Sequence, residues 1–264
     1  MSITTNKLGS LEYLTAENIS AAHCFTTRFG GVSTGYLDSL NIGMHRGDEP
    51  ENVAKNYNIL ANALNFDTKN LVLTHQIHSN IIRAVTKADA QGIDHHQYPE
   101  CDGLVTNDPG TVLTVFTADC TPILLHDPVT GAVGAVHAGW RGTAADIAGN
   151  AVRAMVDHFG CRPENIRAAI GPNIGKCCFQ TDLEVPDAML DALGEAAKTH
   201  IREAGKKYYV DLKAINAQFL KNAGVTSIDI STDCTKCQCD RFWSHRVTGT
   251  RRGSQGAIIV CKEG

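Results

Sequence analysis

The sequence lacks long hydrophobic runs and has no excess of positive charge. No apolar stretch in its 264 residues approaches the ~18 needed to cross a bilayer, so we expect no transmembrane helix. Residues 1–20 contain Asn6, Glu12 and Glu17 and no uninterrupted apolar core, which argues against a signal peptide. The formal net charge is −4, which disfavours binding to nucleic acid or to an acidic membrane. We therefore expect a cytoplasmic protein.

Several well-known catalytic motifs are also missing. There is no H-E-x-x-H zinc-protease motif, no G-x-x-x-x-G-K-[ST] phosphate loop, no G-x-G-x-x-G and no nucleobase-deaminase pattern of H-x-E with P-C-x-x-C. The segment Gly31-Val-Ser33-Thr-Gly35 has the letters G-x-S-x-G, but no helical pattern follows it directly. We interpret this segment as a loop, which disfavours serine-hydrolase chemistry.

The composition is that of an ordinary globular protein, with 43% hydrophobic and 20% charged residues and a mean hydropathy of −0.14. No internal repeat, low-complexity tract or linker appears, so we expect one domain over residues 1–264, with residues 1–10 flexible. Ten cysteines without an export signal indicate reduced thiols, some of them metal-binding or catalytic, rather than a disulfide framework.

Periodicity predicts an α+β fold. Several strands follow one another without regular helical crossovers, which is typical of mixed or antiparallel sheets covered by helices. Helices are expected at 48–64, 142–159, 183–200 and 213–222. Strands are expected at 11–14, 22–27, 70–73, 81–85, 103–106, 111–116, 123–126, 132–136, 167–170, 208–212, 227–230, 241–243 and 256–261.

The most informative stretch is 117–142. Two apolar runs are joined by the polar turn 127–131, which predicts an antiparallel hairpin. Cys120 precedes the first run and His137 ends the second, so the two side chains are expected to be neighbours. Such a pair is either a nucleophile with its base or two ligands of a metal ion.

His78, which lies close to another predicted strand, can join this pair. Two histidines and one cysteine leave one tetrahedral position open, which is the composition of a catalytic zinc site, where bound water has a pKa of about 7. The alternative is that Cys120 is a small core residue and that both histidines are ordinary surface groups. The spacing alone leaves both interpretations open.

Two arginines beside glycines are candidates for anion binding. Arg28 precedes Phe-Gly-Gly, and Arg141 lies in Gly-Trp-Arg-Gly before a helix that we expect to begin at Gly142. A guanidinium suits phosphate or carboxylate, and a helix start adds backbone N–H groups. Taken singly, each arginine is more often structural.

The remaining cysteines and histidines are harder to interpret. Cys234, Cys237 and Cys239, with His245 beyond them, look like a metal knuckle, but structural thiols in a tight loop are the alternative. The adjacent Cys177 and Cys178 are expected to be idle. The histidines with no evident partner are His75, His95, His96 and His126.

A series of short motifs, in order along the chain, resembles one protein family. They are FTTRFGGVS (25–33) with SLN (39–41), QIHSN (76–80), DGLVTN (102–107), TADCTP (117–122), HAGWRG (137–142), IGPNIG (170–175), and CTKC (234–237) with FWSHR (242–246). From residue 25 onward the chain resembles the YfiH/YlmD-type laccase-domain family, of which FAMIN is an animal relative. Two departures, Trp243 in place of phenylalanine and the extra thiol of Cys239, do not touch the His78–Cys120–His137 triad.

The resemblance implies a layered YfiH-like fold, similar to the cysteine-hydrolase fold of a bacterial toxin. It implies a metal site of His78, Cys120 and His137, usually zinc, and catalysis by these residues with Asp119. It also implies phosphorolysis of adenosine, inosine, guanosine or methylthioadenosine by inorganic phosphate, and deamination of adenosine. The motif positions suggest that substrate or phosphate is bound by Arg28, Asn41, Gln76 and Arg141.

The family's older label of copper-dependent polyphenol oxidase is harder to support. Multicopper oxidases need H-x-H repeats and several copper sites, and the sequence contains no such pattern. A thiolate with two imidazoles would still bind copper tightly. A metal-free Cys–His hydrolase, an editing factor for peptidoglycan precursors and a non-catalytic partner-binding protein also stay open, as do a monomer and a homodimer.

Overall fold

The computed structural model describes residues 2–93 and 98–262, so His95 and His96 lie outside the described residues. The strands within these ranges are β1 (Ile3–Leu8), β2 (Leu11–Ala16), β3 (His23–Thr26), β4 (Leu71–Val72), β5 (Ile82–Ala84), β6 (Gly103–Thr106), β7 (Val112–Thr117), β8 (Thr121–His126), β9 (Val133–Ala138), β10 (Arg167–Ile170), β11 (Gln180–Thr181), β12 (Ile201–Ala204), β13 (Lys207–Val210), β14 (Ser227–Ile230) and β15 (Gln255–Val260). The helices are α1 (Pro50–Leu64), α2 (Trp140–Ala144), α3 (Ile147–Phe159), α4 (Glu184–Leu193), α5 (Glu195–Lys198), α6 (Leu212–Asn222) and α7 (His245–Thr248).

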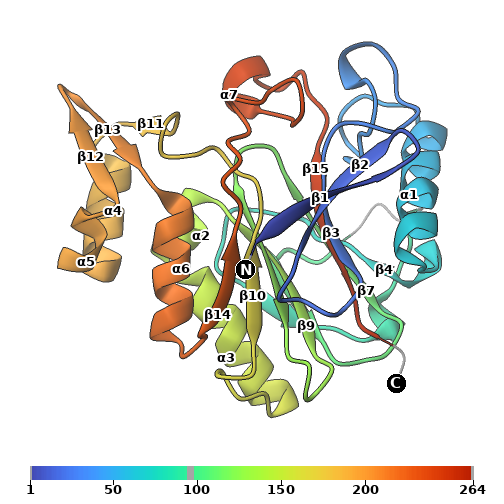
Figure 1. Ribbon diagram of the computed structural model, residues 1–264, viewed down its shortest axis with the longest axis horizontal. Helices are drawn as coiled ribbons and strands as arrows, with labels where there is room; N and C mark the ends of the chain where they lie inside the picture. The colour runs from blue at the N-terminus through green and yellow to red at the C-terminus, as the bar shows by residue number, and fades with distance from the viewer. Residues whose placement is uncertain (1, 94–97, 263–264) are drawn as a thin grey trace.

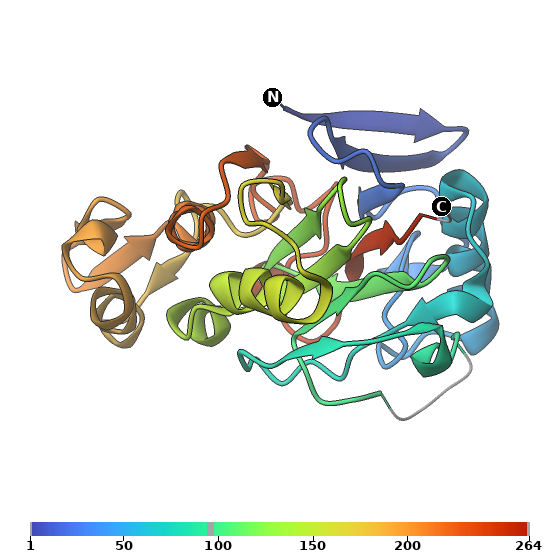
Figure 2. The ribbon, with the colours of Figure 1, turned by 90° about the horizontal axis from the view of Figure 1, so that it is seen from below.

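Two large sheets pack face to face and are covered by helices on their outer sides (Figures 1 and 2). In the described part of the chain, the first sheet has the order β1-β2-β3-β15-β7-β4 and the second has the order β14-β10-β8-β9-β6-β5. Most neighbours are antiparallel, whereas β4–β7, β5–β6 and β10–β14 are parallel. The sheets are therefore mixed, as the sequence predicts.

Alternation of side chains along the strands creates the layers. In β15, Ala257 and Ile259 belong to the core between the two sheets, while Ile258 packs with α1 on the outer face of the first sheet. In β8, Leu124 faces the core between the sheets, and its neighbours Ile123 and Leu125 pack with α3 and α6. Both faces of both central sheets are thus buried, which gives the central strands their nearly continuous apolar sequences.

The β8–β9 hairpin positions the candidate site. Its register pairs Thr121 with Ala138 and Pro122 with His137, which confirms the predicted antiparallel hairpin. Asp127 closes the turn by accepting a hydrogen bond from the backbone N–H of Val129 at 2.8 Å. Cys120 directly precedes β8, so the hairpin brings it to the same edge of the second sheet as His137.

A smaller lobe projects from one side of the molecule (Figure 1). It contains α4, α5 and a sheet with the strand order β11-β13-β12 within the described residues. The sequence predicts a largely helical segment over 183–200 that is broken near Gly194, and it does not predict β12. The structure breaks this helix at Gly194, which has a φ of 59°, and pairs β12 with β13.

Other local expectations need correction. Residues 3–8, expected to be flexible, form β1, because each of them pairs with a residue of β2 in an antiparallel register. The helix expected from Gly142 begins at Trp140 and is interrupted before Ile147, where Asp146 accepts a hydrogen bond from the Gly149 N–H and starts α3. Residues 241–243, expected to be a strand, form a turn instead, because backbone N–H groups at 241 and 242 donate to a carbonyl at 238. No helix of the described chain is long and apolar enough to cross a membrane.

His23 in β3 is buried as a neutral ring. Its Nε2 accepts a hydrogen bond from the Ala16 N–H at 2.8 Å, so the proton lies on Nδ1, which faces the Ala21 carbonyl at 2.8 Å. Burial lowers the pKa of His23 below its ordinary value of 6.5. Below pH 6.5 the unfolded chain therefore binds a proton that the folded chain does not bind, and stability falls as the pH falls.

We expect the wild-type free energy of unfolding to decrease between pH 7.5 and pH 5.5. This one group contributes up to about 1.4 kcal/mol per pH unit. The His23→Gln variant, whose amide oxygen can accept the same N–H, should show a shallower decrease in denaturant titrations at the two pH values. The exposed His158 supplies the control, because His158→Gln should keep the wild-type slope. Equal slopes for all three proteins would contradict the prediction.

Candidate metal centre

His78, Cys120 and His137 converge at one edge of the second sheet. Their ligand atoms all lie within 4.8 Å of one another. The Cys120 Sγ is 3.8 Å from the His78 Nε2, and the two imidazole rings meet edge to face with centroids 4.9 Å apart. His137 is buried, Cys120 is half-buried and His78 is exposed, so the cluster opens to solvent on the His78 side.

Strained backbone helps to aim two of these side chains. His78 lies in the loop between β4 and β5 with a φ of 60°, and Asp119, next to Cys120, has a φ of 89°. Residues other than glycine adopt such angles only when their surroundings hold them there. His137, in contrast, is fixed by its regular place in β9.

Asp102 holds the two histidines. Its buried carboxylate accepts backbone hydrogen bonds from Ile77, His78 and Ser79, together with one from the Ser79 hydroxyl. It also lies 2.8 Å from the His137 Nδ1, which leaves the His137 Nε2 free to act as a ligand. Burial alone would raise the pKa of Asp102, but the hydrogen bonds from His137 and Ser79 outweigh it and lower the pKa to about 2.

Sequence reasoning did not assign Asp102 to the site. The available signal was its place inside the motif 102–107, directly before the apolar strand β6. A carboxylate there has no local partner along the chain, and its partners come from the 77–79 loop and from β9.

The cluster favours a thiolate. Burial would raise the pKa of Cys120, but His137 and His78 outweigh it and lower the pKa to about 6. Burial would lower the pKa of His137, but Cys120 and Asp102 outweigh it and raise the pKa to about 9. One thiolate and two imidazoles, one of them oriented by a carboxylate, fit a zinc ion with an open fourth position.

Asp119 occupies a different position from the one expected of a catalytic group. Its carboxylate accepts hydrogen bonds from the hydroxyls of Thr235 (2.6 Å) and Ser244 (3.1 Å) and from the Arg246 N–H (2.6 Å). These donors occupy the carboxylate inside the protein. We therefore replace the expected catalytic role of Asp119 with a positioning role, in which it anchors the residue preceding Cys120.

Asn41 and Gln76 also support loops. The Asn41 side chain is fully buried and donates to Asp48 and Gly43 while it accepts from the backbone of Gly43 and Ser254, so it does not face a substrate. Gln76, two residues before His78, forms a pair of hydrogen bonds with the backbone of Phe116 at 2.8 and 2.6 Å. Gln76 is half-buried and lines a cavity, so it alone of these two amides faces open space.

The two arginines predicted to bind anions belong to separate networks. Arg28 donates to the carbonyls of Asp38 and Cys239 and lies over the Trp243 ring, with 4.0 Å from its guanidinium carbon to the ring centroid. Arg141 lies over the neighbouring Trp140 ring. Its guanidinium is 3.7 Å from the carboxylate of an exposed glutamate at the start of α4. Neither arginine forms a hydrogen bond with the triad in the described chain.

A second pair of arginines, Arg46 and Arg252, was not singled out from the sequence, and the charge of Cys120 acts on Arg252. Arg46 and Arg252 both reach the Ser254 hydroxyl, at 3.2 and 3.5 Å. Burial and the nearby Arg46 lower the pKa of Arg252 to about 10, and the charges of Asp119 and Cys120 oppose this shift. Arg252 thus interacts electrostatically with both Arg46 and Cys120, so this pair of partly buried guanidiniums adds positive charge on the side of the candidate metal centre.

A cavity of about 550 Å³ adjoins this region. Its lining includes Arg46, Gln76 and Ser254, which connect it to the arginine pair and to the loop that carries His78. Phe116 and Tyr98 supply aromatic surface. The cavity is therefore amphipathic, with aromatic surface and a guanidinium on its lining.

The architecture is that of a YfiH-type protein. The structure of YlmD from Geobacillus stearothermophilus aligns with a TM-score of 0.91 and 36% identity over 98% of this chain and 99% of that chain. The structure of the YfiH protein of Bacillus licheniformis aligns with a TM-score of 0.90 and 33% identity over the same shares. Residues 22–262 also match the family described as multi-copper polyphenol oxidoreductase laccase, and the chain belongs to this laccase-domain family.

Relatives of this chain carry an enzyme name. Purine nucleoside phosphorylase YlmD of Bacillus subtilis is 35% identical over 246 residues, which cover 90% of this chain and 88% of that protein. Purine nucleoside phosphorylase of Deinococcus radiodurans is 38% identical over 250 residues, which cover 94% and 92%. The mouse protein LACC1, with the same enzyme name, is 32% identical over 91% of this chain and 56% of its own length. These findings confirm the family resemblance and the α+β class.

Replacing Asp102 by asparagine should weaken metal binding. Asparagine removes the negative charge that orients His137 and leaves only one side-chain oxygen as an acceptor, although the backbone N–H groups of Ile77, His78 and Ser79 all need one. We expect the affinity for zinc to fall roughly 10- to 100-fold, measured by competition with a chromogenic chelator. Asp108→Asn, which removes a carboxylate bonded to the Lys87 N–H elsewhere, is the control and should keep wild-type affinity. Unchanged affinity in Asp102→Asn would remove this residue from the site.

Proposed function

We propose that this protein is a zinc-dependent purine nucleoside phosphorylase that also deaminates adenosine. Its substrates are adenosine, inosine, guanosine or methylthioadenosine together with inorganic phosphate, and its phosphorolysis products are the free base and ribose 1-phosphate, or 5-methylthioribose 1-phosphate from methylthioadenosine. The proposal rests on one observation, that the His78–Cys120–His137 cluster, the arginine pair and the aromatic cavity adjoin one another. The names of the relatives support the same activity.

The residues His78, Cys120 and His137 would hold the zinc ion. The donor set fits zinc because it combines one thiolate with two imidazoles and has the Asp102 carboxylate behind His137. When bound, the metal supplies a Lewis acid at the edge of the cavity. Copper would bind the same ligands, but neither phosphorolysis nor deamination requires a change of oxidation state.

Arg46 and Arg252 are the proposed phosphate ligands. Burial lowers the pKa of both guanidiniums, and Arg46 lowers that of Arg252 further, so a bound anion would relieve an unfavourable burial of positive charge. Their common contact with Ser254 keeps them together. Arg28 and Arg141, expected from the sequence, are already engaged by protein groups and are the second choice.

The purine would lie in the cavity against Phe116 and Tyr98, with Gln76 between the cavity and the cluster. Phosphate held by the two arginines then faces the anomeric carbon of the sugar. A phosphate oxygen forms a bond to C1′ while the bond from C1′ to the base nitrogen breaks. The base leaves with that electron pair and takes up a proton, and the positive charge of the arginines stabilises the phosphate in position.

A product assay tests the proposed reaction. Zinc-loaded protein should release adenine, hypoxanthine or guanine only when phosphate is present, together with ribose 1-phosphate in equal amount, as followed by chromatography. Adenosine should also yield inosine without phosphate. Cys120→Ala should lose the metal bound at the His78–Cys120–His137 cluster together with turnover, whereas Cys239→Ser, which removes a thiol outside that cluster, should keep both. Nucleoside that stays intact with zinc and phosphate present would refute the proposal.

Separate variants test the phosphate site. Arg46→Ala and Arg252→Ala should each raise the KM for phosphate roughly 10- to 100-fold, as expected from losing a charge-assisted hydrogen bond worth about 1.5–3 kcal/mol. The KM for nucleoside should change less. Arg162→Ala, which removes an exposed arginine elsewhere, should have no effect. If only Arg28→Ala or Arg141→Ala raises the KM for phosphate, the anion site is the one suggested by the sequence.

One specific observation favours a second candidate, metal-free cysteine hydrolysis. Cys120 interacts with His137, and His137 with Asp102, in the order in which a nucleophile, its base and an orienting carboxylate contact one another. An alkylating reagent that labels Cys120 rapidly in metal-free protein as isolated would support this alternative. Stoichiometric metal with a shielded thiol would reject it. Phenol oxidation that appears with copper and disappears with zinc would instead indicate oxidase chemistry.

A further inference from the structure

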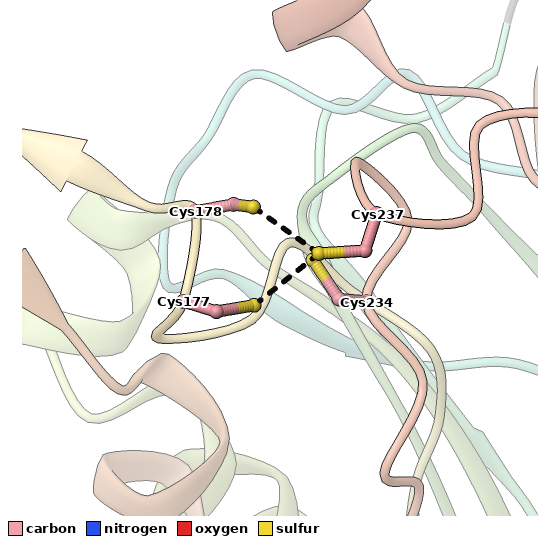
Figure 3. A group of neighbouring side chains, drawn as sticks. All are labelled: Cys177, Cys178, Cys234 and Cys237. Carbon is pink, nitrogen blue, oxygen red and sulfur yellow. Dashed lines mark hydrogen bonds between the residues drawn. The ribbon is translucent and has the colours of Figure 1, made fainter.

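Four cysteines converge in a second cluster, at the base of the smaller lobe. Cys177 and Cys178 lie in the loop between β10 and β11, while Cys234 and Cys237 lie in the loop between β14 and α7 (Figure 3). The Sγ atoms of all four are within 4.8 Å of one another. The sequence suggests that Cys177 and Cys178 are buried or idle, but Cys177 is exposed, and the fold places both against the C-x-x-C segment.

The sulfur separations suit a metal ion better than disulfide bonds. The Cys237 Sγ lies 3.6 Å from that of Cys177 and 3.4 Å from that of Cys178, well beyond the ~2.05 Å of a disulfide. Zinc–sulfur bonds of about 2.3 Å in a tetrahedron place sulfur atoms about 3.8 Å apart. The observed separations of 3.6 and 3.4 Å lie slightly below this value, and one sulfur approaches two others at once, which a disulfide does not allow.

The backbone around the cluster is built for thiolates. The Gly175 N–H donates to the Cys234 Sγ at 3.2 Å, and the backbone of Cys237 bonds to the same sulfur. A side chain at Gly175 would meet Cys234 and Cys177 within 3.3 Å, so glycine allows this close approach. Such N–H bonds to sulfur orient and stabilise thiolate ligands.

A buried cation lies beneath the cluster. Lys213 in α6 is 7% exposed and donates to the carbonyls of Ser231 (2.7 Å) and Asp233 (2.6 Å), directly before Cys234. The charges of Cys234 and Cys177 act on this ammonium group. Four thiolates around a divalent ion leave a net charge of about −2, which a buried ammonium partly balances.

We propose that Cys177, Cys178, Cys234 and Cys237 bind a second zinc ion in a closed, structural four-sulfur site. Four protein ligands leave no open coordination position, so this site does not act on substrate. It is separate from the His78–Cys120–His137 cluster, and the proposal does not depend on the proposed nucleoside chemistry.

A metal ion at this site would also stabilise the first cluster, because two loops connect the clusters through hydrogen bonds. Thr235, between two of the cysteines, donates its hydroxyl to Asp119 at 2.6 Å and its backbone N–H to the Asn173 carbonyl at 3.0 Å. Ile174, three residues before Cys177, donates to the Asp119 carbonyl at 2.9 Å. A zinc ion that ties the two loops together would therefore hold Asp119, and with it the backbone next to Cys120.

Metal analysis of the full-length protein, expressed with zinc and purified without chelator, tests the proposal. We expect two zinc ions per wild-type chain, one in Cys120→Ala, one in Cys237→Ser and none in the double variant. Cys239→Ser, which removes a neighbouring thiol outside the cluster, should keep two. A wild-type chain with a single zinc ion that Cys237→Ser retains would overturn the proposal, as would a disulfide among the four cysteines in protein alkylated at lysis.

Cobalt provides a second measurement that does not require Cys237→Ser to fold. In Cys120→Ala the first cluster has no thiolate, so every sulfur-to-cobalt charge-transfer band must come from the four cysteines. We expect apo-Cys120→Ala to bind one Co²⁺ with the intense absorption of a four-thiolate tetrahedral site, and zinc to displace it. Absence of that absorption would overturn the proposal. Both measurements are made without nucleoside, so their outcome is distinct from the fate of the proposed enzyme activity.

Discussion

The buried carboxylate of Asp102 is the interaction on which the candidate metal centre depends. It accepts three backbone N–H groups of the 77–79 loop, the Ser79 hydroxyl, and a hydrogen bond at the His137 Nδ1. The same group therefore fixes the left-handed backbone at His78 and selects the ring nitrogen that His137 presents. An ionised carboxylate is stable in this buried position because so many donors surround it.

Asp119 positions Cys120, the third proposed ligand, much as Asp102 positions the two histidines. Its carboxylate joins the start of β8 to Thr235, Ser244 and the Arg246 backbone, which all come from the C-terminal part of the chain. Cys120 thus projects from a segment held on both sides, by β8 and by these loops. The ligands are preorganised by hydrogen bonds beneath them, and this arrangement lets two imidazoles and a thiolate stay close together beside solvent.

The surrounding charges support the proposal that the site binds an anionic co-substrate. Arg46 and Arg252 share one hydroxyl near Cys120, whereas Arg28 and Arg141 bind carbonyls, a carboxylate and indole rings. The four-cysteine cluster lies behind the same C-terminal loops, so a metal there would stabilise the frame of the site and not its open face.

The sequence by itself predicted most of the helices and strands and the proximity of Cys120 and His137. The period of apolar residues indicated the helices and most strands, and the hairpin with its polar turn predicted that Cys120 and His137 are neighbours. Only the tertiary structure decided which polar groups remain free to act. Asn41 and Asp119 look available in sequence, yet both are occupied by partners up to 213 and 127 residues away. Cys177 and Cys178 meet Cys237 across about 60 residues. Hydrogen bonds and thiol clusters depend on separation in space, which local periodicity does not encode.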